Sequence, residues 1–158
     1  MAPRRGSGGT GGAPAFSFKL DKDLDELSQM LLALEEFAEK HGVSAVQTQR
    51  ITLSVDELVT NIIKYGTKEV EHTYIHLWAT ITDGTFHIEI EDHGIPFDPF
   101  HEAPVPDTTL PLEDRPIGGL GVFLVQSLMT STSYQRIKDR NRITLTRSLA
   151  ASDQEEAQ

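Results

Sequence analysis

Three groups of residues in this chain have types and spacings that could do chemistry. Glu57 and Asn61 are four residues apart, so a helix would place a carboxylate and an amide oxygen on one face. Asp92 and Gly94 combine a hydrogen-bond acceptor with open backbone. Residues 118–121 contain three glycines before an apolar stretch, and such a segment exposes N–H groups to an anion at a helix start. Together the three groups predict a nucleotide site.

Each group also has an ordinary structural interpretation. A Glu and an Asn four residues apart are commonly the solvated face of an amphipathic helix. An Asp-x-Gly segment often ends a strand in a turn, and clustered glycines can form a tight loop with positive φ. Asn61 favours a functional interpretation, because asparagine is a poor residue inside a helix. The occurrence of all three groups in this order favours one site over three coincidences.

The hydrophobic pattern predicts the elements that position these groups. We expect a strand at 16–20, helices at 22–41 and 44–65, a hairpin of 73–82 with 85–91, a helix at 120–129, and a second hairpin of 133–137 with 142–147. Six prolines between 92 and 116 predict a long loop, which we interpret as a lid. This order predicts an α+β fold, a two-layer sandwich with helices on one face of a mixed, mostly antiparallel sheet.

Composition limits the classes of protein that remain. A chain of 158 residues suits one domain, expected at 16–149, between a flexible Gly/Pro-rich tail at 1–15 and a disordered tail at 150–158. The net charge of −10 argues against direct nucleic-acid binding, and no apolar run approaches the roughly 20 residues of a membrane span. The lack of cysteine fits a reducing compartment, so we expect a cytoplasmic protein.

The three groups resemble the N, G1 and G2 boxes of the histidine-kinase-like ATPase superfamily, which has the Bergerat fold. Residues 54–61, 88–98 and 118–125 carry the resemblance, which covers most of 16–147. Within the superfamily the chain is most similar to the anti-sigma-factor serine/threonine kinases. The resemblance therefore implies that the chain binds ATP and phosphorylates an anti-sigma-factor antagonist.

The resemblance also implies a role for each matching residue at the nucleotide. Asn61 would give its amide oxygen to Mg²⁺, a cation that prefers oxygen ligands. Asp92 would accept a hydrogen bond from the exocyclic amine of adenine, and Gly94 would let the backbone approach the ring. The backbone around Gly119, Leu120 and Gly121 would hold the phosphates at the start of a helix.

Two further residues would take part in phosphoryl transfer. Glu57 would be the base that accepts the hydroxyl proton, and Arg115 resembles the lid arginine that meets the γ-phosphate. The sequence departs from the family at Pro96, where many members carry a second glycine. We expect this proline to stiffen the adenine edge of the site.

The leading hypothesis is thus an ATP-dependent serine kinase that docks a folded protein substrate and regulates transcription indirectly. A sigma factor is a further candidate partner, and a homodimer is an expectation of the resemblance. The alternative is a nucleotide-dependent binding switch that sequesters a sigma factor or a phosphatase without productive transfer. A detached catalytic module of a histidine kinase is a third reading. No Walker-type phosphate loop is present in the sequence.

Overall fold

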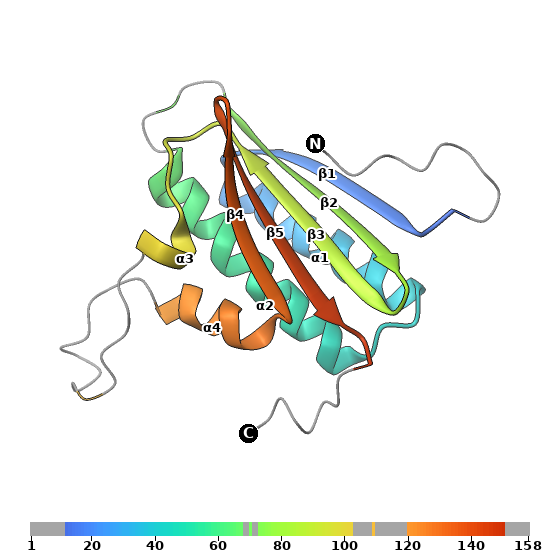
Figure 1. Cartoon of the computed structure of the whole chain (residues 1–158). Coiled ribbons are helices and arrows are strands. Elements are labelled where there is room, and N and C mark those ends of the chain that lie inside the picture. The colour runs from blue at the N-terminus through green and yellow to red at the C-terminus, as the bar shows by residue number, and fades with distance from the viewer. Residues whose placement is uncertain (1–11, 68–69, 71–72, 103–108, 110–119, 151–158) are drawn as a thin grey trace.

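The described residues form a sheet covered on one face by helices. The computed structural model describes residues 12–67, 70, 73–102, 109 and 120–150. Its elements are, in order, β1 (Ala15–Asp21), α1 (Leu24–Lys40), α2 (Ala45–Asn61), the π-helical turn η1 (Ile62–Gly66), β2 (Tyr74–Thr82), β3 (Thr85–Asp92), α3 (Pro99–Glu102), α4 (Leu120–Leu128), β4 (Ser131–Ile137) and β5 (Arg140–Ser148). Helices α1, α2 and α4 lie on the same face of the sheet (Figure 1). The predicted two-layer α+β fold is confirmed.

The sheet has the strand order β1-β2-β3-β5-β4, and each neighbouring pair in the described chain is antiparallel. The sequence had allowed a mixed sheet, so the structure is more regular than expected. Asp83 and Gly84, with φ of 53° and 71°, close the tight turn between β2 and β3. The predicted first hairpin is therefore confirmed.

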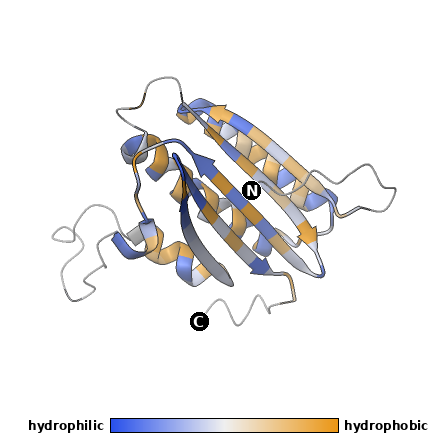
Figure 2. Ribbon diagram, turned by 45° about the horizontal axis from the view of Figure 1, so that its top comes forward, coloured by the Kyte–Doolittle hydropathy of each residue, from blue (hydrophilic) through white to orange (hydrophobic). Residues whose placement is uncertain are grey.

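The core lies between the sheet and the helices. Apolar and polar residues alternate along the strands, because successive side chains point to opposite faces (Figure 2). The buried side chains facing this layer include Leu34, Ile51, Val55, Leu77, Phe86, Ile88 and Leu145, each at most 1% exposed. Burial of one such side chain stabilises the fold by about 1.5–3 kcal/mol. The apolar period thus fixes which faces of α1 and α2 contact the sheet.

Side-chain caps set the helix boundaries. Asp23 accepts a hydrogen bond from the backbone of Asp25 at 2.7 Å and begins α1, and Ser44 accepts one from the backbone of Gln47 at 3.2 Å and begins α2. Gly42, with φ of 80°, follows α1 as expected. In the part of the chain that the structure describes, no helix is long and apolar enough to cross a membrane.

The last turn of the predicted helix 44–65 is wider than an α-helix. Regular helix ends at Asn61 and continues as the π-helical turn η1 to Gly66. Both the backbone N–H and the hydroxyl of the buried Thr67 donate to the carbonyl of Ile62, at 2.9 and 3.0 Å. Lys22 donates in turn to the carbonyl of Thr67 at 2.8 Å. These bonds hold the end of the helix in place, and π-turns are frequent at functional sites.

The C-terminal end of helix α4 is fixed by a buried arginine. Arg147 on β5 is 1% exposed, and its Nη1 donates to the carbonyl of Leu128, the last residue of α4, at 2.7 Å. Its Nε donates to the side chain of Gln47 at the start of α2. Arg147 therefore ties the end of α4 to both the sheet and α2.

The long proline-rich segment contains one helical turn that the sequence analysis did not predict. In α3, the Asp98 side chain accepts from the backbone of Phe100 at 2.9 Å, and the Glu102 side chain accepts from the backbone of Asp98. Pro99 occupies the first helical position, where its missing N–H costs nothing. Asp98 and Glu102, two acidic residues on either side of this turn that can each cap backbone N–H groups, are the sequence signal by which the helical turn could have been predicted. Most of the expected lid lies outside the described residues.

The second hairpin also differs from the expectation at its turn. Strand β5 begins at Arg140, two residues earlier than predicted, because Lys138 adopts a positive φ of 55° and closes a shorter turn. Asn141 consequently lies inside the sheet instead of in the turn. It is paired with Asp92 on β3 and with Arg136 on β4.

Candidate functional site

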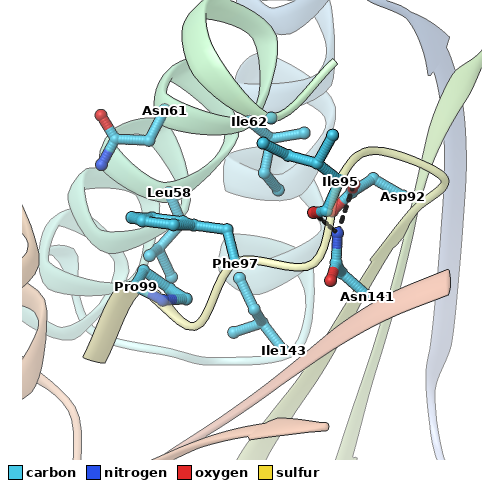
Figure 3. Close-up of a pocket in the computed structure, with 10 residues that line it drawn as sticks. Leu58, Asn61, Ile62, Asp92, Ile95, Phe97, Pro99, Asn141 and Ile143 are labelled. Atoms are coloured by element: carbon cyan, nitrogen blue, oxygen red, sulfur yellow. Dashed lines mark hydrogen bonds between the residues drawn. The ribbon is translucent and has the colours of Figure 1, made fainter. Parts of the chain in front are cut away.

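A pocket lies between the end of α2, the turn after β3 and the start of β5. It is lined by Leu58, Asn61, Ile62, Gly66, Asp92, Ile95, Phe97, Pro99, Asn141 and Ile143 (Figure 3). Asp92 and Asn141 lie at one end, whereas Asn61 lies at the other end and its amide points away from them. The lining between these ends is mostly apolar. The pocket thus joins two of the predicted groups, through Asn61 and Asp92.

The pocket is narrow in this structure. Its cavity volume is about 20 Å³, which is room for roughly one water molecule. Ile95 and Phe97 lie on the turn after β3 and are 56% and 36% exposed. A flat heterocyclic ring is larger than this cavity, so the lining of the pocket would have to move outward to admit one.

Asp92 is the buried acid of the pocket, with 2% of its surface exposed. Its Oδ1 accepts from the backbone N–H of Gly94 at 2.8 Å and from Nδ2 of Asn141 at 3.0 Å. Burial raises the pKa of Asp92, while these two hydrogen bonds and the charges of His93 and Arg136 oppose that rise. Among the described residues no donor contacts Oδ2. This second oxygen can accept a hydrogen bond from a bound molecule.

Gly94 is required by a close contact between two backbone segments. The N–H of Ile95 donates to the carbonyl of Gly66 at 3.1 Å. A Cβ atom on Gly94 would lie 2.2 Å from that carbonyl oxygen and 2.8 Å from Oδ1 of Asp92. The turn after β3 therefore packs directly on the end of η1, which is a reason for this glycine that the sequence analysis did not consider.

Glu57 is half-buried on α2 and lies against the first turn of α4. A Cβ atom on Gly121 would lie 2.1 Å from Oε2 of Glu57 and 2.9 Å from its Cδ. The positive end of a helix dipole favours a carboxylate at this place. The structure thus brings together the predicted base and the last glycine of the third group.

Other predicted site residues fall outside what the structure describes. Arg115 and Gly119 lie in the undescribed range 110–119, and Leu120 is the first residue of α4, with no description of its side chain. In the described ranges no three His, Asp or Glu side chains form a group that could hold a metal ion. The assignment of Asn61 as a magnesium ligand remains a prediction.

Three residues around Asp92 were not predicted from the sequence to belong to the site. Asn141 is 4% exposed and contacts Asp92 directly, while Tyr134 and Arg136 on β4 contact Asn141. They were missed because Asn141 was assigned to a turn. With a turn two residues shorter, the alternation of inward and outward side chains along β5 extends back to Asn141. That alternation is the sequence signal from which Asn141 could have been placed in the sheet.

Comparison with known proteins identifies the family. The model of the histidine kinase-like ATPase domain matches residues 20–147. The chain belongs to this family of histidine kinase-like ATPase domains, and membership implies that it binds ATP.

Two curated relatives show which proteins this chain is similar to in sequence. A serine/threonine-protein kinase, BtrW of Bordetella bronchiseptica, is 33% identical over 113 residues, covering 72% of this chain and 79% of the relative. A serine-protein kinase, RsbW of Staphylococcus epidermidis, is 31% identical over 126 residues, covering 77% of this chain and 79% of the relative. The chain is thus similar to proteins named as protein kinases.

Solved structures share the fold. The structure of the RsbU and RsbW domains of a Mycobacterium tuberculosis protein aligns with a TM-score of 0.61 at 17% identity, over 85% of this chain and 32% of that chain. The histidine kinase domain of a blue-light activated kinase from Erythrobacter litoralis aligns with a TM-score of 0.52 at 15% identity, over 84% of this chain and 64% of that chain. The chain thus spans about a third of the mycobacterial structure and about two thirds of the Erythrobacter one.

Proposed function

We propose that this chain is a serine/threonine protein kinase of the anti-sigma-factor type. It transfers a phosphoryl group from ATP to an anti-sigma-factor antagonist and so regulates transcription indirectly, in the cytoplasm. The proposal is supported by the family, by relatives named as serine kinases, and by the resemblance of the three sequence groups.

One observation supports phosphoryl transfer and not nucleotide binding alone. The carboxylate of Glu57 lies against Gly121, in the first turn of α4. Backbone N–H groups at the start of a helix favour phosphate oxygens, so a base and a phosphate site would be neighbours. A serine hydroxyl placed there could give its proton to Glu57 as its oxygen bonds to the γ-phosphorus of ATP, while the bond from that phosphorus to the bridging oxygen breaks and ADP leaves.

The remaining residues would bind and orient. When bound, ATP would supply the phosphoryl group and Mg²⁺ would neutralise charge on its phosphate oxygens. Asp92 would accept a hydrogen bond from the adenine amine through Oδ2, and Leu58, Ile62 and Ile143 would contact the ring. Asn61 would give Mg²⁺ one protein ligand, the usual arrangement when phosphates supply others. We assign Arg115 and the backbone of residues 119–121 to the γ-phosphate end by the resemblance alone.

The proposed partners follow from the same resemblance. The substrate would be a folded antagonist domain that presents a serine, and a sigma factor would be a second partner. A dimer of this chain is part of the proposal.

The experiment combines transfer and binding measurements on one substitution. Purified protein is incubated with γ-labelled ATP, Mg²⁺ and a candidate antagonist domain. Wild type should label a serine of the antagonist. Glu57→Gln should label it about 100-fold or more slowly, because general-base catalysis is lost, while its affinity for ATP should not fall.

Asp56→Asn is the matched control, because Asp56 is the adjacent half-buried acid on α2, where it accepts from Thr60 at 3.2 Å. This variant should transfer at nearly the wild-type rate. Equal rates for Glu57→Gln and wild type would remove Glu57 as the base. Tight ATP binding by wild type without transfer would favour the binding switch, the alternative for which Pro96 and the proline-rich segment leave room. A wild-type protein that does not bind ATP would contradict the nucleotide site itself.

A further inference from the structure

A second buried polar residue lies beside Asp92 in the pocket. Asn141 is the second residue of β5 and is paired across the sheet with Asp92 on one side and Arg136 on the other. Its side chain is on the helix-covered face and lines the same pocket as Asp92 (Figure 3). A buried amide needs partners for both its donors and its acceptor, so its contacts indicate what holds it there.

All of the hydrogen-bonding capacity of Asn141 is used. Nδ2 donates to Oδ1 of Asp92 at 3.0 Å and to the carbonyl of Ile95 at 2.8 Å. Oδ1 accepts from the hydroxyl of Tyr134 at 2.5 Å and from Nη1 of Arg136 at 3.2 Å. A reversed amide would set its oxygen against a carboxylate and a carbonyl. The surroundings therefore permit one orientation of the amide.

This orientation determines which oxygen of Asp92 a ligand can reach. Oδ1 receives two hydrogen bonds, from Asn141 and from the backbone of Gly94, and both come from groups fixed in the protein. Nδ2 of Asn141 also holds the carbonyl of Ile95, and Arg136 holds the carbonyl of Gly94 at 2.8 Å. The same network thus fixes the carboxylate plane and the turn that borders the pocket.

We infer that Asn141 is a positioning residue for base recognition: it holds Asp92 so that Oδ2 is directed to the exocyclic amine of the bound adenine, with Tyr134 and Arg136 fixing the amide. The inference rests on the proposed function, because it deepens the role given to Asp92. The hydrogen bond from Asn141 also favours the charged form of Asp92 against the effect of burial. An amine donor is bound more strongly by a charged acceptor than by a neutral one.

The test compares two nucleotides that differ only in that amine. Dissociation constants of ATP and of purine riboside triphosphate, which lacks the exocyclic amine, are measured by calorimetry for wild type and for Asn141→Leu. Wild type should prefer ATP by about tenfold, the size expected for one hydrogen bond to a charged group. In Asn141→Leu the affinity for ATP should fall by about tenfold, while that for the purine analogue should change by less than about threefold.

If Asn141 had a purely structural role, Asn141→Leu would lower the affinity for ATP and for the purine analogue equally, and that result would overturn the inference. Tyr134→Phe is a milder variant that removes only the hydroxyl bonded to Oδ1 of Asn141, and it decides the matter if Asn141→Leu does not fold. In Tyr134→Phe the ratio of the affinities for ATP and for the purine analogue should fall by about threefold. An unchanged ratio would count against the inference. The proposed nucleotide site fails separately, if wild type binds neither nucleotide.

Discussion

At the scale of single residues, Asp92 shows how a binding site costs stability. Its carboxylate is almost completely buried, and burial is the largest influence on its pKa. Removing a charge from water is unfavourable unless hydrogen bonds replace the solvent, and Asp92 has such bonds at one oxygen. Among the described residues the second oxygen has no donor, so it is the atom of Asp92 that a bound ligand could use.

Asp92→Asn should separate this stability cost from function. The amide oxygen can still accept from Gly94 and Asn141, so the fold should persist. Because the raised pKa means that the folded state disfavours the charged form, wild type gains stability as the pH falls towards that pKa. The variant should therefore unfold at a higher temperature than wild type at neutral pH, and the difference should shrink as the pH is lowered towards the raised pKa of Asp92. Its affinity for ATP should fall by about tenfold or more.

Thermal unfolding at a series of pH values from neutral to acidic, and a calorimetric titration with ATP at neutral pH, check this prediction. Asp139→Asn is the matched control, since the side chain of Asp139 is 79% exposed and lies 3.7 Å from His93. It should change neither quantity. A less stable Asp92→Asn with normal affinity for ATP would contradict our account of Asp92.

At the scale of elements, the site depends on two places where backbones or helices approach closely. The turn after β3 packs on the end of η1 through Gly94 and Gly66, and α4 packs on α2 where Gly121 meets Glu57. In the first contact the obstacle to a larger residue is rigid backbone, whereas in the second it is a flexible side chain. The two glycines are therefore needed for different reasons.

Gly94→Ala should be clearly destabilising. Its methyl group would lie 2.2 Å from the carbonyl oxygen of Gly66, so the turn or η1 must shift. We expect a loss of about 2 kcal/mol in the free energy of unfolding, measured by urea denaturation. Gly66→Ala is the control from the other side of the same contact, because among the described residues its Cβ would meet only Ile62, at 3.9 Å. It should cost less than about 0.5 kcal/mol, and an equal loss for both variants would contradict the proposed clash.

At the scale of the whole molecule, the two faces of the sheet differ. One face carries α1, α2 and α4 (Figure 1), and the pocket lies where the end of α2 meets the β3 and β5 strands. On the other face Trp78 is only 8% exposed, and its ring stacks on His76 with centroids 3.7 Å apart. Nearby, the buried Arg142 pairs with Glu91. Aromatic and charged side chains thus cover this face of the sheet.

Removal of residues 1–11 and 151–158 tests whether most of the two predicted tails, 1–15 and 150–158, is dispensable for the fold. The composition of both ends favours tails, whereas Pro14 accepts a hydrogen bond from Ile81 and Leu149 donates one to Gly84. The shortened chain should keep the melting temperature of wild type within about 2 °C and bind ATP with unchanged affinity. Differential scanning calorimetry and an ATP titration measure both. A larger fall in melting temperature would show that one end contributes to the fold.

The sequence by itself determined most of the elements, though not α3 or the π-helical turn η1, together with their order and the family resemblance. These follow from local information, since the apolar period sets each helix and strand and the Asp-Gly turn sets the first hairpin. It also named Glu57, Asn61 and Asp92, whose residue types and spacings are visible in one dimension. It misjudged Asn141, because a shift of two residues at the Lys138 turn moves that side chain from a loop into the sheet.

Only the tertiary structure decided which of these residues meet. The contact of Glu57 with Gly121 joins residues 64 positions apart, and the bond between Asn141 and Asp92 joins residues 49 positions apart. The requirement for Gly94 likewise depends on the carbonyl of Gly66, which reaches it because the helix ends in a π-turn. Contacts between distant segments depend on how layers pack and how strands are registered, and no local pattern encodes these.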